Sequence, residues 1–230
     1  MTQTTTPNTA NRSVLNYLRT LTPHRVCDFA EAIQLAERQA GRLANWLALP
    51  ADEFVQVADL AGLARIQIAY ARLPVSGMSH WTGQHWLITL NTRDSPVRQR
   101  FTALHEFKHI IDHGQVNRLY VGNRRLTSKQ QAEKAADFFA GCALIPRPAL
   151  KRAWGNGLQR VDDLADYFGV SRQAIEVRLD QTGLSATNDL TATSRCARPI
   201  RTARHHFQRF VEVTSRQEIL TPQPVHGVVR

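Results

Sequence analysis

The feature that constrains this chain most is a pair of histidines four residues apart, in the segment His105-Glu-Phe-Lys-His109. On an α-helix this spacing gives about 40° of rotation and about 6 Å of rise, so both imidazole rings can reach one cation. Apolar residues at Phe101, Leu104 and Ile110 recur around the pair with helical periodicity. The motif therefore predicts an amphipathic helix that presents two metal ligands.

Zinc is the cofactor that this ligand chemistry favours. Neutral imidazole and carboxylate in tetrahedral geometry suit Zn²⁺, whereas Mg²⁺ or Ca²⁺ would require mostly oxygen ligands. Glu106 follows the first histidine and is expected on the side of the metal where a water would bind. Its carboxylate can take a proton from that water, so Glu106 is the predicted general base of a peptide-bond hydrolysis.

A third ligand distinguishes a working site from a chance match. Metallopeptidases of the three-histidine class need a histidine six residues after His109, where this chain has Gln115, so that class is excluded. The other class takes a carboxylate from a following helix. Glu133 lies in such a segment, and the small residues Ala136 and Ala140 on neighbouring turns would let two helices approach closely. Glu133 is the predicted third ligand.

Two further residues near the motif have alternative interpretations. Asp137 lies four residues after Glu133 on the same helix face, so it could ligate the metal or accept a hydrogen bond from His105 or His109. We favour the hydrogen-bonding role. His113 is about 12 Å from His105 in rise and cannot share one ion with it, so we expect a solvent-near or loop-bonded residue at the helix end.

The apolar pattern of the chain predicts an α+β fold that is mainly helical. Alternation of apolar and polar residues predicts a small antiparallel sheet from strands over 65–73, 78–81 and 85–91. Helical spacing predicts helices over 26–49, 53–63, 96–113, 128–144, 161–168 and 171–181, with a short one after Pro148.

The last two predicted helices, joined across Gly169-Val170 with Ser171 as N-cap, are typical of a helix-turn-helix. Taken alone, this pair predicts nucleic-acid contacts from Arg172, Gln173 and Arg178. The alternative is that the second helix packs on the catalytic core. We favour packing, because four acidic side chains would repel phosphates along much of the pair: Asp162, Asp163, Asp166 and Glu176.

Composition and charge divide the chain into four expected regions. These are a flexible leader over 1–24, a metallopeptidase domain over 25–157, the helix-turn-helix-like segment over 158–184 and a basic tail over 185–230. The net charge of +10 predicts attraction to anionic partners, including DNA through the basic surface, without specifying a sequence.

The compartment is expected to be the cytoplasm. The N-terminus lacks the basic and apolar regions of a secretory signal, and no apolar run of about 18 residues could cross a membrane. Cys27, Cys142 and Cys196 are odd in number and irregularly spaced, which fits neither a disulfide framework nor a paired-cysteine metal site. We expect reduced, structural thiols.

Three stretches of the chain resemble the ImmA/IrrE-type metallo-endopeptidases. They are residues 100–113, residues 133–140 and the exit Leu144-Ile-Pro146. Ile88-Thr-Leu-Asn91 is similar to the strand that the family places before the active-site helix, so the resemblance covers about residues 26–183. One departure is Lys108, where the family usually has a small residue. A long cation there could line the cleft or alter substrate preference.

The resemblance implies a thermolysin-like zinc core, with ligands on His105, His109 and Glu133 and with Glu106 catalytic. It also implies a substrate class, because members typically cleave helix-turn-helix repressors and so release mobile-element or stress-response genes. The 46 residues after Leu184 are too few for the C-terminal sensor domain of the radiation-response branch. The mobile-element type is the closer analogy.

A function of another class also fits the sequence. The chain could be a DNA-binding regulator or antitoxin-like module in which the helix pair contacts DNA and the zinc site is structural or inactive. The residue that stabilises the oxyanion stays open in the peptidase interpretation, with Tyr120, His80 and Lys108 as candidates.

Overall fold

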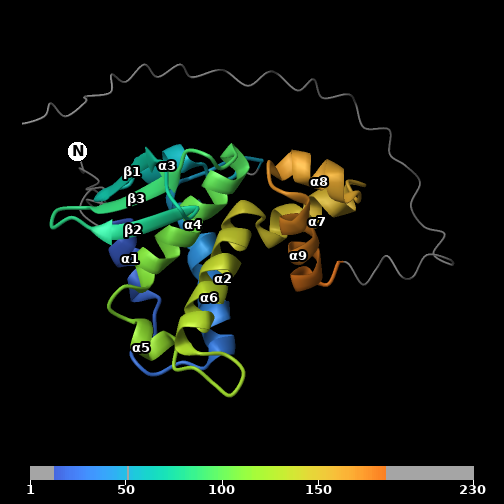
Figure 1. The fold of residues 1–230 in the computed structure, drawn as a ribbon. Coiled ribbons are helices and arrows are strands. Elements are labelled where there is room, and N and C mark those ends of the chain that lie inside the picture. The colour runs from blue at the N-terminus through green and yellow to red at the C-terminus, as the bar shows by residue number, and fades with distance from the viewer. Residues whose placement is uncertain (1–12, 51, 185–230) are drawn as a thin grey trace, which may run out of the picture. The chain divides into compact units, whose positions relative to one another are not determined.

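The computed structural model describes residues 13–50 and 52–184, and these form nine helices and a three-stranded sheet (Figure 1). The α+β class predicted from the sequence is confirmed. The basic tail with Cys196 and the first half of the predicted leader lie outside the described residues. Cys27 and Cys142 are buried free thiols, as expected.

The sheet has the strand order β1-β3-β2, with β1 over Ile66–Ala71, β2 over Gly77–Trp81 and β3 over Trp86–Asn91. The hairpin β2–β3 is antiparallel, but β1 pairs with β3 in parallel, so the predicted all-antiparallel sheet is wrong. The reason lies in burial. β3 is the most buried strand and takes the centre, which puts β1 beside the strand that runs in its own direction.

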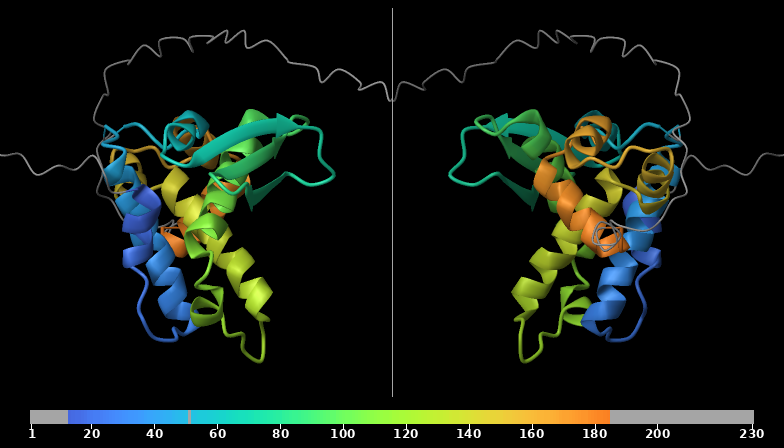
Figure 2. Two further views of the ribbon diagram at one scale, coloured as in Figure 1. Left: turned by 90° about the vertical axis from the view of Figure 1, so that its left-hand side faces the viewer. Right: turned by 90° about the vertical axis from the view of Figure 1, so that its right-hand side faces the viewer.

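The helix α4, Pro96–Asp112, packs against β2 and β3 and carries the two histidines. Its start follows from the sequence: the hydroxyl of Ser95 accepts a hydrogen bond from the backbone N–H of Arg98, and Pro96 occupies the first helical turn. One face of α4 is fully buried and includes Phe107 and Ile110. The side views show the strands together at one end, next to α4 (Figure 2).

The helices α2, Phe29–Trp46, and α6, Ser128–Leu144, pack against each other, and α6 also packs against α4. A capping box at each N-terminus accounts for where they begin, formed by Asp28 with Glu31 in α2 and by Thr127 with Gln130 in α6. Because α6 lies between α2 and α4, its position relative to the histidines is determined by packing on two sides.

The leader predicted over residues 1–24 is wrong for its described part. Residues Val14–Thr20 form α1, in which Val14, Leu15 and Leu18 are buried in the main hydrophobic core. Arg19 of α1 donates hydrogen bonds to the carbonyls of Ile110 and Ile111 at the end of α4, at 2.6 and 3.0 Å. A helix of seven residues is stable only through such tertiary contacts, which composition does not reveal.

The remaining helices are α3 (Val57–Ala61), α5 (Val116–Leu119), α7 (Arg147–Gly155), α8 (Val161–Phe168) and α9 (Arg172–Thr182). Leu164, Phe168, Ile175 and Leu179 of α8 and α9 belong to the same core cluster as the apolar face of α4. No helix within residues 13–50 or 52–184 has the length and hydropathy needed to span a bilayer.

Candidate metal centre

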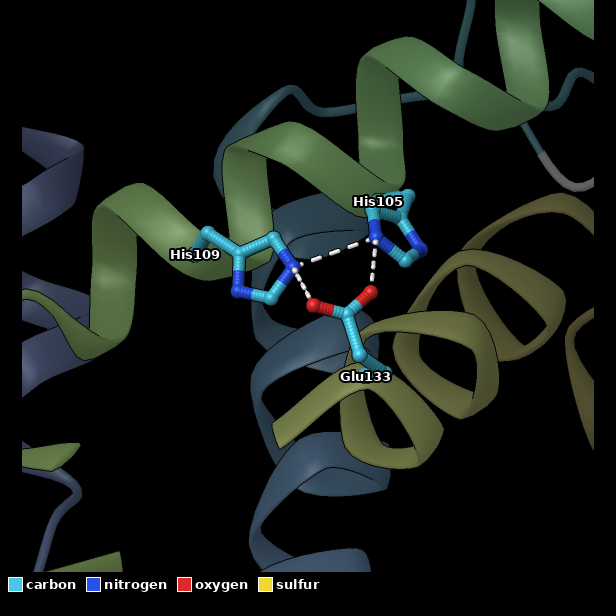
Figure 3. A group of neighbouring side chains, drawn as sticks. All are labelled: His105, His109 and Glu133. Carbon is cyan, nitrogen blue, oxygen red and sulfur yellow. Dashed lines mark hydrogen bonds and ion pairs between the residues drawn. The ribbon is translucent and has the colours of Figure 1, made fainter. Parts of the chain in front are cut away.

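The side chains of His105, His109 and Glu133 converge between α4 and α6 (Figure 3). The Nε2 atoms of the two histidines lie 3.1 Å apart, and the Glu133 carboxylate lies 3.3 Å from Nε2 of His105 and 3.7 Å from Nε2 of His109. Among the described residues these three are the group of His, Cys, Asp or Glu side chains placed to hold one metal ion.

The spacing of these atoms fits a divalent cation of the zinc type. Ligands about 2.0 to 2.1 Å from a tetrahedral Zn²⁺ lie about 3.3 Å from one another, which is close to the observed separations. Two nitrogens and one carboxylate also leave a fourth position for water or substrate, as catalytic sites do and structural zinc sites do not. The partial exposure of the side chains, 17% for His105, 29% for His109 and 49% for Glu133, gives access to that position.

Asp137 accepts a hydrogen bond from Nδ1 of His105 at 2.8 Å. This contact corresponds to the hydrogen-bonding role favoured from the sequence. Since Nδ1 donates to the carboxylate, the lone pair of the ring is on Nε2, which faces the other two ligands. Asp137 therefore fixes the orientation of the His105 ring and is not part of the candidate group itself.

The two histidines have pKa values displaced in opposite directions. Burial lowers the pKa of His105, but the hydrogen bond and charge of Asp137 together with the charges of Glu106 and Glu133 outweigh it, so this pKa lies above its ordinary value. Burial and then the neighbouring His105 hold the pKa of His109 below its ordinary value. Opposite shifts are expected of two nitrogens that share one proton, and a cation at the same position would replace that proton.

Ser79 is a site residue that sequence reasoning missed. It lies in β2, and its hydroxyl donates a hydrogen bond to Oε2 of Glu106 at 2.8 Å. The charge of Glu106 contributes in the upward direction to the pKa values of both histidines, although burial and His105 keep that of His109 below its ordinary value. A serine 27 positions from its partner gives no signal in the sequence, because the contact exists only once β2 packs on α4.

Lys108 does not line the cleft, which corrects one expectation. Its side chain is fully buried and its Nζ donates to Oδ1 of Asp112 at 2.5 Å, while the hydroxyl of Tyr120 donates to Oδ2 of the same carboxylate at 2.6 Å. Burial lowers the pKa of Lys108, and burial with the charge of Asp112 raises the pKa of Tyr120. Lys108 and Tyr120 are therefore buried and bonded to Asp112, so neither is placed to stabilise an oxyanion.

His113 is the exposed C-cap residue of α4, and its ring contacts Trp86 edge to face with centroids 4.8 Å apart. It lies at the end of the helix, as expected. Its ring extends the aromatic cluster at the end of the β2–β3 hairpin.

The predicted nucleic-acid contacts do not form one surface. Arg178 is 2% exposed and donates to the carbonyl of Ile145 at 3.1 Å and to Glu37 at 3.4 Å, so its prediction as a DNA contact is wrong. The cause is packing: α9 directs this residue toward α6, where its guanidinium also lies over the ring of Phe138. Gln173 is exposed, and Arg172 is exposed but paired with Asp162.

The turn between α8 and α9 is also fixed by a buried side chain, that of Arg100. Gly169 has a left-handed backbone with φ of 60°, and its carbonyl and that of Phe168 accept hydrogen bonds from Nη1 of Arg100 at 3.1 and 3.2 Å. Arg100 is a buried residue of α4, and its Nε donates to the carbonyl of Val55. The helix pair is therefore attached directly to the helix that carries the metal ligands.

Two histidines on α4, a carboxylate from α6 and a glutamate beside the first histidine are the arrangement expected of a metallopeptidase site. The family comparison agrees. Residues 64–180, just over half of the 230 residues, match the IrrE N-terminal-like domain, a peptidase family, and the protein belongs to this family of metallopeptidases. The match contains all three residues of the candidate centre as well as Ser79 and Glu106.

The fold is similar to that of solved structures. One of them is a Mycobacterium tuberculosis transcriptional regulator, with a TM-score of 0.52 and 16% sequence identity over 74% of this chain and 52% of that one. The chain thus spans about half the length of that regulator, and the likeness concerns the fold. No match was found among curated proteins.

Proposed function

We propose that this protein is a zinc-dependent endopeptidase of the cytoplasm that cleaves a helix-turn-helix transcriptional repressor. The observation that carries the catalytic part is the convergence of His105, His109 and Glu133 next to Glu106. Membership of a metallopeptidase family supports the same reaction. The repressor as substrate rests on the resemblance to the ImmA/IrrE type, and a similar fold in a chain called a transcriptional regulator is consistent with that setting.

In this mechanism His105, His109 and Glu133 would hold the zinc, and Asp137 keeps the lone pair of His105 on Nε2. When bound, the zinc would polarise the scissile carbonyl and lower the pKa of a water molecule to about 7. Glu106 takes a proton from the water molecule as the water oxygen bonds to the carbonyl carbon. The same carboxyl group then gives that proton to the amide nitrogen as the carbon–nitrogen bond breaks.

The substrate segment is expected to be extended where it crosses the site. β2 is an outer strand of the described sheet, so one edge of it presents unpaired backbone N–H and C=O groups. Ser79 places that strand within hydrogen-bonding distance of Glu106. A peptide paired with the free edge of β2 would therefore bring its backbone next to the catalytic carboxylate. Folded helices in a repressor would need to open locally before cleavage.

The proposal is tested with wild type, Glu106→Gln and the matched control Glu53→Gln, which changes an exposed glutamate in the loop before α3. Each protein is analysed for metal content and then incubated with the helix-turn-helix repressor encoded next to its gene, with cleavage followed by intact mass. We expect one zinc per chain in all three. Cleavage is expected from wild type and Glu53→Gln, and a fall of at least about 100-fold for Glu106→Gln.

Two results would reject parts of this proposal. Cleavage that persists in Glu106→Gln would show that another residue or a contaminating peptidase is responsible. Zinc without cleavage of the adjacent repressor, but with cleavage of other unfolded proteins, would retain the peptidase and reject the repressor as its substrate.

A further inference from the structure

An exposed tryptophan lies two residues after Ser79 on β2 and takes no part in the reaction described above. Trp81, the last residue of β2, is 43% exposed, whereas Trp86 opposite it in the hairpin is partly buried. Large aromatic side chains with one open face are frequent anchor points for binding partners, because covering them removes much apolar surface from water. The position of Trp81 indicates which partner would cover it.

Trp81 and Ser79 lie on the same face of β2, because successive side chains of a strand alternate between faces. Ser79 on this face reaches Glu106, so the face is directed toward the reacting groups. Residues i and i+2 of a strand are about 6.6 Å apart, so Trp81 lies about that far along β2 from Ser79, the residue bonded to the catalytic carboxylate.

Three aromatic rings form a continuous row at this end of the site. The ring centroids of Trp81 and Trp86 are 5.5 Å apart, and those of Trp86 and His113 are 4.8 Å apart. The row runs from the outer strand β2 through β3 to the end of α4. Trp81 is thus backed by a second indole and by a ring fixed at the C-cap of the helix that carries both histidines.

A structural explanation of this row is also available. A cross-strand aromatic pair such as Trp81–Trp86 stabilises a hairpin by itself, typically by less than about 1 kcal/mol. That role needs only the ring face that contacts Trp86 and does not depend on any substrate. The two explanations differ in whether replacing Trp81 changes the choice of cleaved sequence.

We propose that Trp81, backed by Trp86 and His113, forms a subsite for a large apolar or aromatic side chain of the substrate. The inference rests on the proposed peptidase function and deepens it. In a peptide paired with the free edge of β2, the residue next to Ser79 lies at the catalytic carboxylate, and the next residue on the same face is two positions away. The apolar side chain of the substrate is therefore expected about two residues from the cleaved bond. Its position is either always before the bond or always after it.

The test uses the full-length zinc-loaded protein and a peptide mixture made by digesting a bacterial proteome, with cleavage sites identified by mass spectrometry. Trp81→Thr is the main variant, because threonine suits a strand and preserves the hairpin. Trp81→Phe is the conservative rescue. Met78→Ala is the matched control, since Met78 is 45% exposed on the same strand but on the opposite face.

We expect wild-type cleavage sites to share a large apolar residue at one fixed position near the bond. Trp81→Thr should lose that preference and cleave synthetic peptides carrying Phe at that position with kcat/KM reduced about 10-fold to 30-fold. Peptides with Ala at that position should be cleaved by Trp81→Thr at nearly the same rate as by wild type. Trp81→Phe should recover most of the preference, and Met78→Ala should behave as wild type.

The subsite is rejected if wild-type sites show no apolar preference, if Trp81→Thr retains it, or if Met78→Ala loses it to the same extent. Any of these results would leave the peptidase function intact, because cleavage would still occur. Zinc-loaded wild type that cleaves no peptide and no protein would reject the proposed function itself, and the subsite with it.

Discussion

The helix pairs α4–α6 and α8–α9 each carry a sequence motif, but the polar residues of only one motif converge on a shared position. In α4–α6 the motif residues His105, His109 and Glu133 meet at a partly exposed position. In α8–α9 the motif residue Arg178 is buried against α6, and the turn glycine is bonded to Arg100. One motif specifies a site and the other specifies packing.

The difference has a physical origin in what each motif requires. A metal motif states the geometry of its own side chains, because residues four apart on a helix must lie on one face. A helix-turn-helix pattern predicts only the backbone, namely two helices, a left-handed glycine and an N-cap, and not what the side chains contact. Any core that accepts this backbone can use it, and here the apolar faces of α8 and α9 join the main core.

The largest effect is expected from removing the carboxylate that α6 contributes. Glu133→Ala leaves two histidines, which hold zinc far more weakly than three ligands, so the purified variant should contain almost no zinc where wild type contains one equivalent. Metal content and a chelator-competition titration measure this. The control Glu176→Ala removes an exposed glutamate of α9 and should retain full occupancy. A Glu133→Ala protein that keeps one equivalent would show that another residue is the third ligand.

A smaller effect, on stability, is expected from Arg178→Ala in α9. The variant leaves the carbonyl of Ile145 without its donor and removes the buried guanidinium from Phe138. Since hydrogen bonds from charged groups contribute about 1.5 to 3 kcal/mol, the free energy of unfolding should fall by about 2 to 3 kcal/mol. The ion pair with the partly exposed Glu37 adds little. Urea unfolding measures the change, and a fall below about 0.5 kcal/mol would mean that the residue is free for another role.

These two helix pairs also show what a single sequence can predict. The bounds of α6 and α8 were predicted to the residue, and α4 to within one, because Thr127, Ser95-Pro96 and Gly169 are local start and stop signals. The convergence of Glu133 with the histidines was inferred from the small residues of α6. Each of these signals lies within the element that it describes or directly next to it.

The contacts that escaped prediction join segments far apart in sequence. Ser79 meets Glu106 only because β2 packs on α4. Lys108 pairs with Asp112 one turn along the same helix, but the carboxylate also accepts a hydrogen bond from Tyr120, which lies beyond the end of α4. The parallel pairing of β1 depends on which strand is central, and the burial of the whole sheet determines this. Such tertiary choices leave no local pattern in one sequence.

An intermediate effect on metal affinity is expected from Asp137→Asn. The amide can still accept from Nδ1 of His105 but carries no charge, so His105 becomes a weaker ligand. We expect zinc affinity to fall about 10-fold to 100-fold, or about 1.4 to 2.7 kcal/mol, with thermal stability of the metal-free protein nearly unchanged. Competition with a chromophoric chelator gives the dissociation constant. Unchanged affinity would limit Asp137 to a surface contact.

The smallest effect is expected from Arg172→Ala, which addresses whether α8–α9 binds DNA. Arg172 is exposed and paired with Asp162, and such surface pairs contribute about 0 to 1 kcal/mol, so unfolding should change by less than about 0.5 kcal/mol. The variant should also bind a random duplex as wild type does over a series of salt concentrations. If the pair instead contacts phosphates through Arg172, wild type will bind one duplex tightly, and the variant will lose affinity with a shallower salt dependence. That result would show that α8–α9 is a DNA-binding site, which is the role that the helix-turn-helix pattern alone predicts.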